Sequence, residues 1–210
     1  MKVHSILAHP NTNNSLNASL FNLTNDFFKQ QNYDVTTLNL FDIADDLAVA
    51  AKKMYGGNPN SSSYLVNWCS ANEQGRIVDV VRDEINKLKQ ADLLYIQTPI
   101  WVYSMPAMLK SYIEQVFLFN EFFTIEEPCS ETDFKINHLT QNKKVFVSMT
   151  TGGSKGMVSH VLNGIENLSN PIKSMFNFVG YEFLEPHVLY STDWHDHSAF
   201  IDHLEKLFIK

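Results

Sequence analysis

The segment HPNTNNSLN, residues 9–17, carries side chains suited to binding a phosphate. It precedes an amphipathic stretch, and the free N–H groups and the dipole at the start of a helix favour an anion. His9, Ser15 and Asn17 could add side-chain donors. Turn and cap roles explain the same residues equally well, with Ser15 as the N-cap. Neither the Walker phosphate loop nor the GxGxxG pattern occurs, which disfavours nucleoside triphosphate hydrolysis and a standard Rossmann dinucleotide site.

Two aromatic residues and two glycines could form the walls of a site for a flat ligand. Trp101 and Tyr103 stand in a short segment after an apolar run, where loops are usually small and polar. Gly152 and Gly153 lack a Cβ, so a ligand could approach their backbone, and their N–H groups could stabilise charge that develops on it. Taken singly, Trp101 could instead pack against one end of the hydrophobic core. A turn that requires positive φ would explain one of the two glycines.

Alternating apolar patterns predict the elements that position these segments. Near-continuous apolar runs such as DLLYIQTP, residues 92–99, are typical of parallel strands covered on both faces. Four-and-three spacing of apolar residues indicates helices. We expect strands within 3–9, 33–40, 92–99, 144–153 and 181–190, and helices within 15–30, 45–54, 73–89, 107–119, 157–178 and 195–209. Residues 120–142 are expected to be irregular.

This alternation predicts an α/β fold, a flavodoxin-like doubly wound sandwich with a five-stranded parallel sheet of order 2-1-3-4-5 and helices on both faces. Strands 1, 3 and 4 are then neighbours, and ligands bind beyond the carboxyl ends of such strands. The segments at 9–17, 99–103 and 150–153 follow those three strands. We therefore expect them to meet in one crevice that holds a planar, aromatic, phosphate-bearing ligand.

The composition narrows the functional classes. The 210 residues fit a single domain, 1–210, with insertions at about 45–70 and 118–143. The net charge of −7 disfavours nucleic acid or a membrane surface as a partner. Cys69 and Cys129 lack metal-binding or disulfide spacing, which favours a reducing cytoplasm. The histidine-rich stretch at 194–203 lacks a metal-ligand spacing, so no metal site is predicted.

Four segments together resemble the flavin-dependent NAD(P)H:quinone oxidoreductases, the DT-diaphorase and modulator of drug activity B group of the flavodoxin-like superfamily. They are LAHPNTNNSLN (7–17), PIWVYSMPAMLKSYIEQVF (99–117), SMTTGGSKGM (148–157) and GYEFLEPHVLYS (180–191). The resemblance implies a cytoplasmic homodimer, with an active site formed partly by the second subunit. It also implies FAD, with FMN as the alternative, NAD(P)H as the electron donor, and two-electron ping-pong reduction of quinones. We expect azo or nitro compounds as further acceptors, because an open apolar face over a reduced flavin is not selective.

The resemblance also assigns residues. The flavin phosphates would be held by His9, Ser15, Leu16 and Asn17. The isoalloxazine would be lined by Pro99, Ile100, Trp101 and Val102, with Tyr103 at its edge. Its polar edge would receive backbone hydrogen bonds from Thr150, Thr151, Gly152 and Gly153.

One departure concerns the proton source. The mammalian diaphorases have a Tyr and a His after TTGG, where this sequence has Val158 and Gly164. His160 is the nearest titratable residue, so we predict it as the catalytic proton donor, with Tyr103 or solvent as the alternative. A flavodoxin-type electron carrier or a regulatory flavoprotein subunit remains the alternative function. A carrier would usually have a hydroxyl-rich Thr-Gly phosphate loop after strand 1, which this chain lacks.

Overall fold

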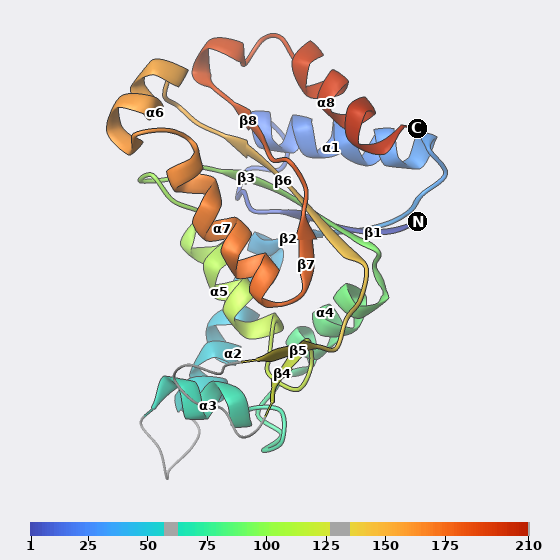
Figure 1. Cartoon of the computed structure of the whole chain (residues 1–210), viewed down its shortest axis with the longest axis vertical. Coiled ribbons are helices and arrows are strands. Elements are labelled where there is room, and N and C mark those ends of the chain that lie inside the picture. Colours follow the sequence, from blue (N-terminus) through green and yellow to red (C-terminus); the bar gives the residue numbers. More distant parts are fainter. Residues whose placement is uncertain (57–62, 127–134, 210) are drawn as a thin grey trace.

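The computed structural model describes residues 1–56, 63–126 and 135–209, which form an α/β sandwich (Figure 1). The strands of the main sheet are β1 (Lys2–Leu7), β2 (Asp34–Asn39), β3 (Leu93–Pro99), β6 (Lys143–Thr150), β7 (Tyr181–Phe183) and β8 (His187–Leu189). The helices are α1 (Leu16–Gln30), α2 (Ala44–Gly56), α3 (Tyr64–Ser70), α4 (Asp79–Gln90), α5 (Ala107–Val116), α6 (Lys155–Leu162), α7 (Glu166–Phe178) and α8 (Ser198–Phe208), with 3-10 turns η1 (Leu40–Ile43) and η2 (Ser191–Asp193).

The main sheet is parallel, with the order β2-β1-β3-β6-β7 and with β8 also paired to β6. The parallel α/β architecture is therefore confirmed, but the expected count of five strands is wrong. The last expected strand, 181–190, is divided into β7 and β8 around Pro186, which has no N–H to donate to a ladder. Between the pairs Val145–Phe183 and Ser148–His187, β6 advances three residues and the edge advances four. The edge therefore contains a bulge.

Helices cover both faces of the sheet, as Figure 1 shows. On one face α1 and α8 pack over a core that includes Leu20, Phe28 and Phe200. On the other face α2, α4, α5 and α7 share a larger core. Every residue of β3 is buried, because this strand lies between β1 and β6 beneath both helical layers. That burial explains its near-continuous apolar sequence.

Residues 118–143 contain structure that the sequence analysis did not predict. Short strands β4 (Phe123–Ile125) and β5 (Ile136–His138) pair antiparallel, so the expectation of an irregular segment is wrong for these residues. Each strand has only three residues, too few to show a period of two. Phe122 and Phe123 are buried, so this segment contributes to the core.

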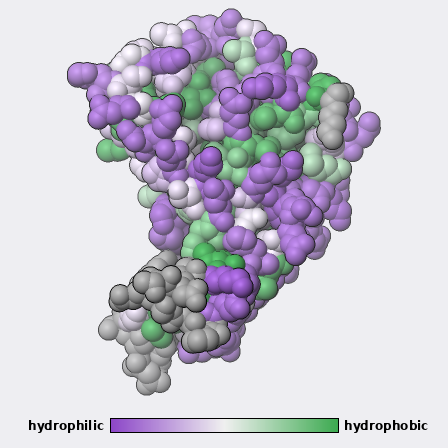
Figure 2. Space-filling view, in the orientation of Figure 1, coloured by the Kyte–Doolittle hydropathy of each residue, from purple (hydrophilic) through white to green (hydrophobic). Residues whose placement is uncertain are grey.

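Three helices are also shorter than expected. The closing helix, expected at 195–209, spans only Ser198–Phe208. The helix expected at 73–89 begins at Asp79, because the chain first forms a turn that includes Gly75 at φ 61°. The helix expected at 107–119 ends at Val116. The face shown in Figure 2 is mostly hydrophilic, with groups of hydrophobic residues between hydrophilic ones. In the part of the chain that the structure describes, no helix is both long and apolar enough to span a bilayer.

Candidate functional site

A cavity of about 470 Å³ lies at the carboxyl edge of the sheet. The segments after β1, β3 and β6 all contribute to it, as the sheet order predicts. It is lined by His9, Ser15, Leu16, Asn17, Pro99, Ile100, Trp101, Thr150, Thr151, Gly152 and Trp194. Ten of these residues are predicted site residues, and Trp194 is the addition. The volume falls within the range of small-molecule sites, roughly 300–1,000 Å³.

The segment between β1 and α1 leaves backbone donors free at the start of the helix. Ser15 is the N-cap, and its Oγ accepts a hydrogen bond from Ala18 N at 3.1 Å while donating to Asn11 O at 2.6 Å. Among the described residues, the N–H groups of Leu16 and Asn17 have no hydrogen-bond partner. The first turn also contains no acidic residue. These features favour an anion at the helix start.

Asn17 has a second role that its predicted one did not include. Its side chain is buried, its Nδ2 donates to Thr150 Oγ1 at 2.9 Å, and its Oδ1 accepts from Gln97 Nε2 at 2.9 Å. Gln97 in turn accepts from the Tyr95 hydroxyl at 2.8 Å, and burial raises the pKa of that hydroxyl, so it remains a donor. This buried chain ties α1, β3 and β6 together immediately below the cavity.

Trp101 stands at the base of a tight turn after β3. Its backbone N and O pair with Ser104 at 2.9 and 3.0 Å, while Val102 and Tyr103 have φ values of 50° and 59°. Positive φ at both central residues is the pattern of a type I′ turn, which normally has Asn or Gly there. A β-branched residue in this conformation costs on the order of 1–3 kcal/mol. Val102 is 96% exposed, so packing of its side chain does not compensate this strain.

The two glycines of TTGG differ in their surroundings. The Gly153 N–H donates to Thr151 Oγ1 at 3.1 Å, and a Cβ on Gly153 would lie 3.2 Å from a methyl of Val158. A Cβ on Gly152 would meet no atom within 4 Å, and within the described chain the Gly152 N–H has no hydrogen-bond partner. Gly152 is therefore the residue that presents open backbone to the cavity.

A smaller cavity of about 170 Å³ adjoins the first and shares Ile100, Thr151 and Gly152 with it. Its other lining residues are Val102, Tyr103, Gly153, Met157 and Val158. Three predicted residues, Val102, Tyr103 and Gly153, thus lie here and not in the larger cavity. His160 lines neither cavity. It follows the buried Val158 by two residues, which places it on the opposite, exposed side of α6.

Three lining residues were not predicted. Met157 and Val158 lie in the first turns of α6. The resemblance marks Val158 only as the position where the mammalian diaphorases have a Tyr, and Met157 only as the last residue of SMTTGGSKGM. Trp194 follows η2 and is 41% exposed. The only available signal was a large aromatic residue in the polar stretch STDWHDH, because a single Trp shows no periodicity.

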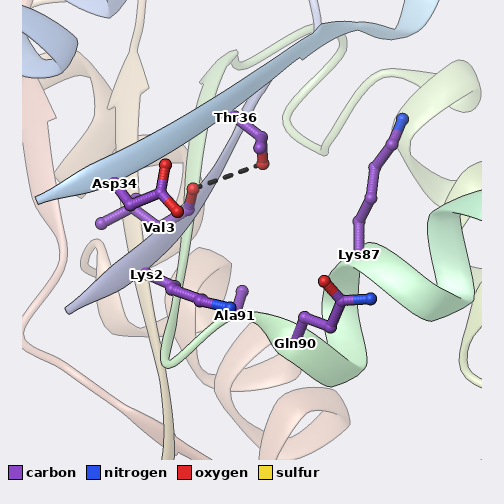
Figure 3. A pocket seen from close by; sticks show the side chains of 7 residues that line it. All are labelled: Lys2, Val3, Asp34, Thr36, Lys87, Gln90 and Ala91. Atoms are coloured by element: carbon purple, nitrogen blue, oxygen red, sulfur yellow. Dashed lines mark hydrogen bonds between the residues drawn. The ribbon is translucent and has the colours of Figure 1, made fainter.

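A cavity at the opposite edge of the sheet is a poor candidate for a cofactor site. It has a volume of about 70 Å³ and is lined by Lys2, Val3, Asp34, Thr36, Lys87, Gln90 and Ala91. Figure 3 shows it between the amino ends of β1 and β2 and the end of α4. It lies at the wrong end of the strands for ligand binding in this type of sheet.

The family described as the flavodoxin-like fold matches residues 1–207. This chain is a member of the flavodoxin-like fold family. Within that family, NAD(P)H dehydrogenase (quinone) 1 of Cavia porcellus is 30% identical over 192 residues, covering 88% of this chain and 66% of that protein. FMN-dependent NADH:quinone oxidoreductase 2 of Colwellia psychrerythraea is 26% identical over 110 residues, covering 52% of this chain and 49% of that protein.

The fold of this flavodoxin-like chain is also found in solved structures. A Klebsiella pneumoniae protein described as a candidate quinone reductase superposes with a TM-score of 0.73 and 26% identity, covering 100% of this chain and 86% of that one. The chain spans about two thirds of the length of the first curated relatives that it matches.

Proposed function

We propose that this protein is a flavin-dependent NAD(P)H oxidoreductase that reduces quinones, with azo or nitro compounds as further acceptors. The observation that carries the proposal is the cavity at the carboxyl edge of the sheet. There, free N–H groups at the start of α1, an open glycine backbone and exposed aromatic side chains meet in a member of the flavodoxin-like family. The relatives named as quinone oxidoreductases support the same reaction class.

The residues present fit a flavin. The unpaired N–H groups of Leu16 and Asn17 suit a phosphate, and the space next to Gly152 suits the edge of a flat ring. We infer that the cofactor is held by His9, Ser15, Leu16, Asn17, Pro99, Ile100, Trp101, Val102, Tyr103, Thr150, Thr151, Gly152 and Gly153. We favour FAD over FMN, although the Colwellia relative is FMN-dependent by name.

When bound, the flavin supplies the two-electron redox chemistry between NAD(P)H and the acceptor. The protein supplies binding, orientation and hydrogen bonds. The Gly152 N–H is the free donor of the TTGG segment, whereas the Gly153 N–H is already used by Thr151. Gly153 then contributes by shape and not as a donor. Trp101 and Ile100 exclude water from one wall of the cavity.

The proton that the acceptor takes up has two proposed sources on this chain, Tyr103 and His160. The position of Tyr103 in the smaller cavity supports its hydroxyl, and His160 lines neither cavity. Replacing Tyr103 with Phe should slow acceptor reduction more than NAD(P)H oxidation in separately measured half-reactions. His160→Ala is the matched comparison. A slower acceptor step in His160→Ala alone would reverse this assignment.

Steady-state NAD(P)H oxidation with a soluble quinone tests the proposed activity. We expect multiple turnovers that depend on added or retained flavin. Negligible turnover together with a stable one-electron semiquinone would favour the electron carrier instead. Release of the flavin and chromatography distinguish FAD from FMN, and failure to bind either at micromolar concentration would refute the proposal.

We further propose that residues 1–210 form a single domain and that the protein is a cytoplasmic homodimer. The exposed apolar side chains beside the smaller cavity, including Val102 and Met157, support a second subunit at this face. Sedimentation of the flavin-loaded protein would measure the oligomeric state directly.

A further inference from the structure

A further large cavity lies at the amino end of β6, between the end of α4 and the β4–β5 hairpin. Its volume is about 430 Å³, and its lining includes Lys89, Glu121, Leu139, Thr140, Gln141 and Lys143. Figure 1 shows the hairpin well away from α6, which borders the proposed flavin site. Along β6, Lys143 and the cavity-lining Thr150 of that site are separated by about 23 Å at the rise of a strand. A ligand of this cavity is therefore separate from the proposed cofactor.

The connection from β5 to β6 leaves backbone donors unused beside this cavity. Leu139 N donates to Phe122 O at 2.8 Å, which fixes the start of the connection. Among the described residues, the next three N–H groups, those of Thr140, Gln141 and Asn142, have no hydrogen-bond partner. Asn142 has a φ of 57°, in the left-handed region. Successive free N–H groups next to a left-handed residue favour an anion.

The carboxylate in the lining of this cavity is already neutralised. Glu121 is only 6% exposed, and its two oxygens form ion pairs with Arg82 and Lys89. Two cations thus surround one carboxylate before Lys143 is considered. The repulsion that Glu121 alone would exert on an anion is therefore offset.

The Lys143 ammonium adds a cation without an ion-pair partner among the described residues. Its Nζ donates to Lys89 O at 2.6 Å and to Ala91 O at 2.5 Å, at the end of α4. Burial lowers the pKa of Lys143, and the charge of Asp92 compensates this only in part. An anion in the cavity would stabilise the charged form of this partly desolvated ammonium.

We propose that this cavity binds a phosphate group, held by the free N–H groups of Thr140 and Gln141 and by the Lys143 ammonium. An ammonium has three N–H bonds, of which Lys143 uses two on carbonyl oxygens, so one remains for a ligand. Donors from a loop and from a strand suit a phosphate, which carries more acceptor oxygens than a carboxylate. Leu139, 52% exposed, provides apolar surface beside them, so the phosphate can be free or belong to an organic phosphate. The inference is independent of the proposed flavin chemistry.

Calorimetric titration of the flavin-loaded protein with inorganic phosphate, at constant ionic strength, tests this assignment. Bound flavin keeps phosphate from the start of α1, so we expect one saturable site. Lys143→Gln should weaken phosphate binding about tenfold or more, because a charge-assisted hydrogen bond is lost. Lys143→Arg should retain most of the affinity. Lys89→Gln should also weaken binding, and it leaves the contacts of Lys143 with the end of α4 in place.

Lys144→Gln is the matched control. It removes the same charge from the next residue of β6, which forms an exposed pair with Glu182 and does not line the cavity. Phosphate binding should be unchanged in this variant. Unchanged flavin affinity shows that each variant is folded. The absence of saturable binding in the wild type, or equal weakening in Lys143→Gln and Lys144→Gln, would overturn the proposal. The comparison holds for flavin-free protein as well, because the start of α1 is the same in every variant.

Phenyl phosphate distinguishes the two sources of the phosphate group. Its ring can cover Leu139, so tighter binding than inorganic phosphate, with the difference lost in Leu139→Ala, would identify an organic phosphate as the ligand. Equal affinities would identify free phosphate. Binding of either compound that Lys143→Gln does not weaken would place it outside this cavity and count against the site.

Discussion

His4, within β1, and His9, two residues after it, lie in opposite environments. His4, near the amino end, is fully buried, and its ring nitrogens lie 2.8 Å from Thr36 Oγ1 and 2.9 Å from Glu84 Oε2. His9, beyond the carboxyl end, is half-buried, and its Nδ1 lies 3.1 Å from the backbone N of Asn11. One histidine is enclosed by partners from other elements, and the other borders an open cavity.

The partners of Glu84 complete this contrast. Its Oε1 accepts from Lys87 Nζ at 2.6 Å, and its Oε2 also accepts from the Tyr112 hydroxyl at 3.0 Å. The polar atoms of this buried group thus satisfy one another, as structural groups must. At the carboxyl edge the Leu16, Asn17 and Gly152 N–H groups keep unused capacity within the described chain. Unused donors beside a cavity, and not buried charge, indicate where a ligand binds.

The largest expected effect is on stability, from Glu84→Ala. Removing the Glu84 carboxylate leaves the buried His4 ring and the buried Tyr112 hydroxyl without this partner. The free energy of unfolding should therefore fall by about 3–5 kcal/mol. Flavin affinity of the folded fraction should not change. Denaturant unfolding measures the first quantity and titration the second. The matched control is Glu182→Ala, which removes an exposed pair with Lys144 and should cost less than about 1 kcal/mol.

Glu84 and its partners should also make the stability of the protein depend on pH. Burial by itself would raise the pKa of Glu84, but hydrogen bonds and charge from His4 and Lys87 outweigh it, so the pKa lies below its ordinary value of 4.5. A carboxylate with a lowered folded pKa stabilises the protein above the unfolded pKa. That contribution is lost as the pH falls from 4.5 toward the lowered pKa. Unfolding measured across this range should show a smaller acid-dependent loss in Glu84→Gln than in the wild type.

A smaller expected effect falls at the other end of the sheet, from Gly152→Val. The new side chain would project into the cavity, because a Cβ there meets no protein atom within 4 Å. Flavin binding should weaken by about 1–3 kcal/mol, the usual range for overpacking, while unfolding stays near the wild-type value. Gly156→Val is the control, since its Cβ is equally unhindered and it lines neither cavity. A large loss of stability with unchanged flavin affinity would contradict the site assignment.

The smallest expected effect comes from Trp101→Ala. This change removes one aromatic wall of the cavity, and an aromatic stacking contact is worth about 0.5–1.5 kcal/mol. Flavin or substrate affinity should fall by a similar amount. Trp101→Phe should restore most of it. Identical titration curves for the wild type and Trp101→Ala would remove Trp101 from the binding surface.

The sequence predicted most of the fold because the decisive signals are local. The apolar runs of β3 and β6, and Ser15 before α1, identify three elements and their order. The association of Asn17 with Gln97 and Thr150 could not be predicted, because these residues are far apart in the sequence and any of them could have faced a ligand. Trp194 was missed for a related reason. Its importance depends on where the chain turns after β8, and no pattern in the residues themselves specifies that turn.

The bulge between β7 and β8 makes segment length a functional constraint. Tyr181, before the bulge, belongs to the core beneath α2, α4, α5 and α7, whereas Leu189, an even number of residues later, belongs to the core beneath α1 and α8. The extra residue thus inverts the phase of the strand. Deleting Glu185 would reverse that inversion, turn Leu189 away from α8 and rotate the following turn that carries Trp194. Substitutions between Leu184 and Pro186 should therefore be tolerated far better than a one-residue insertion or deletion.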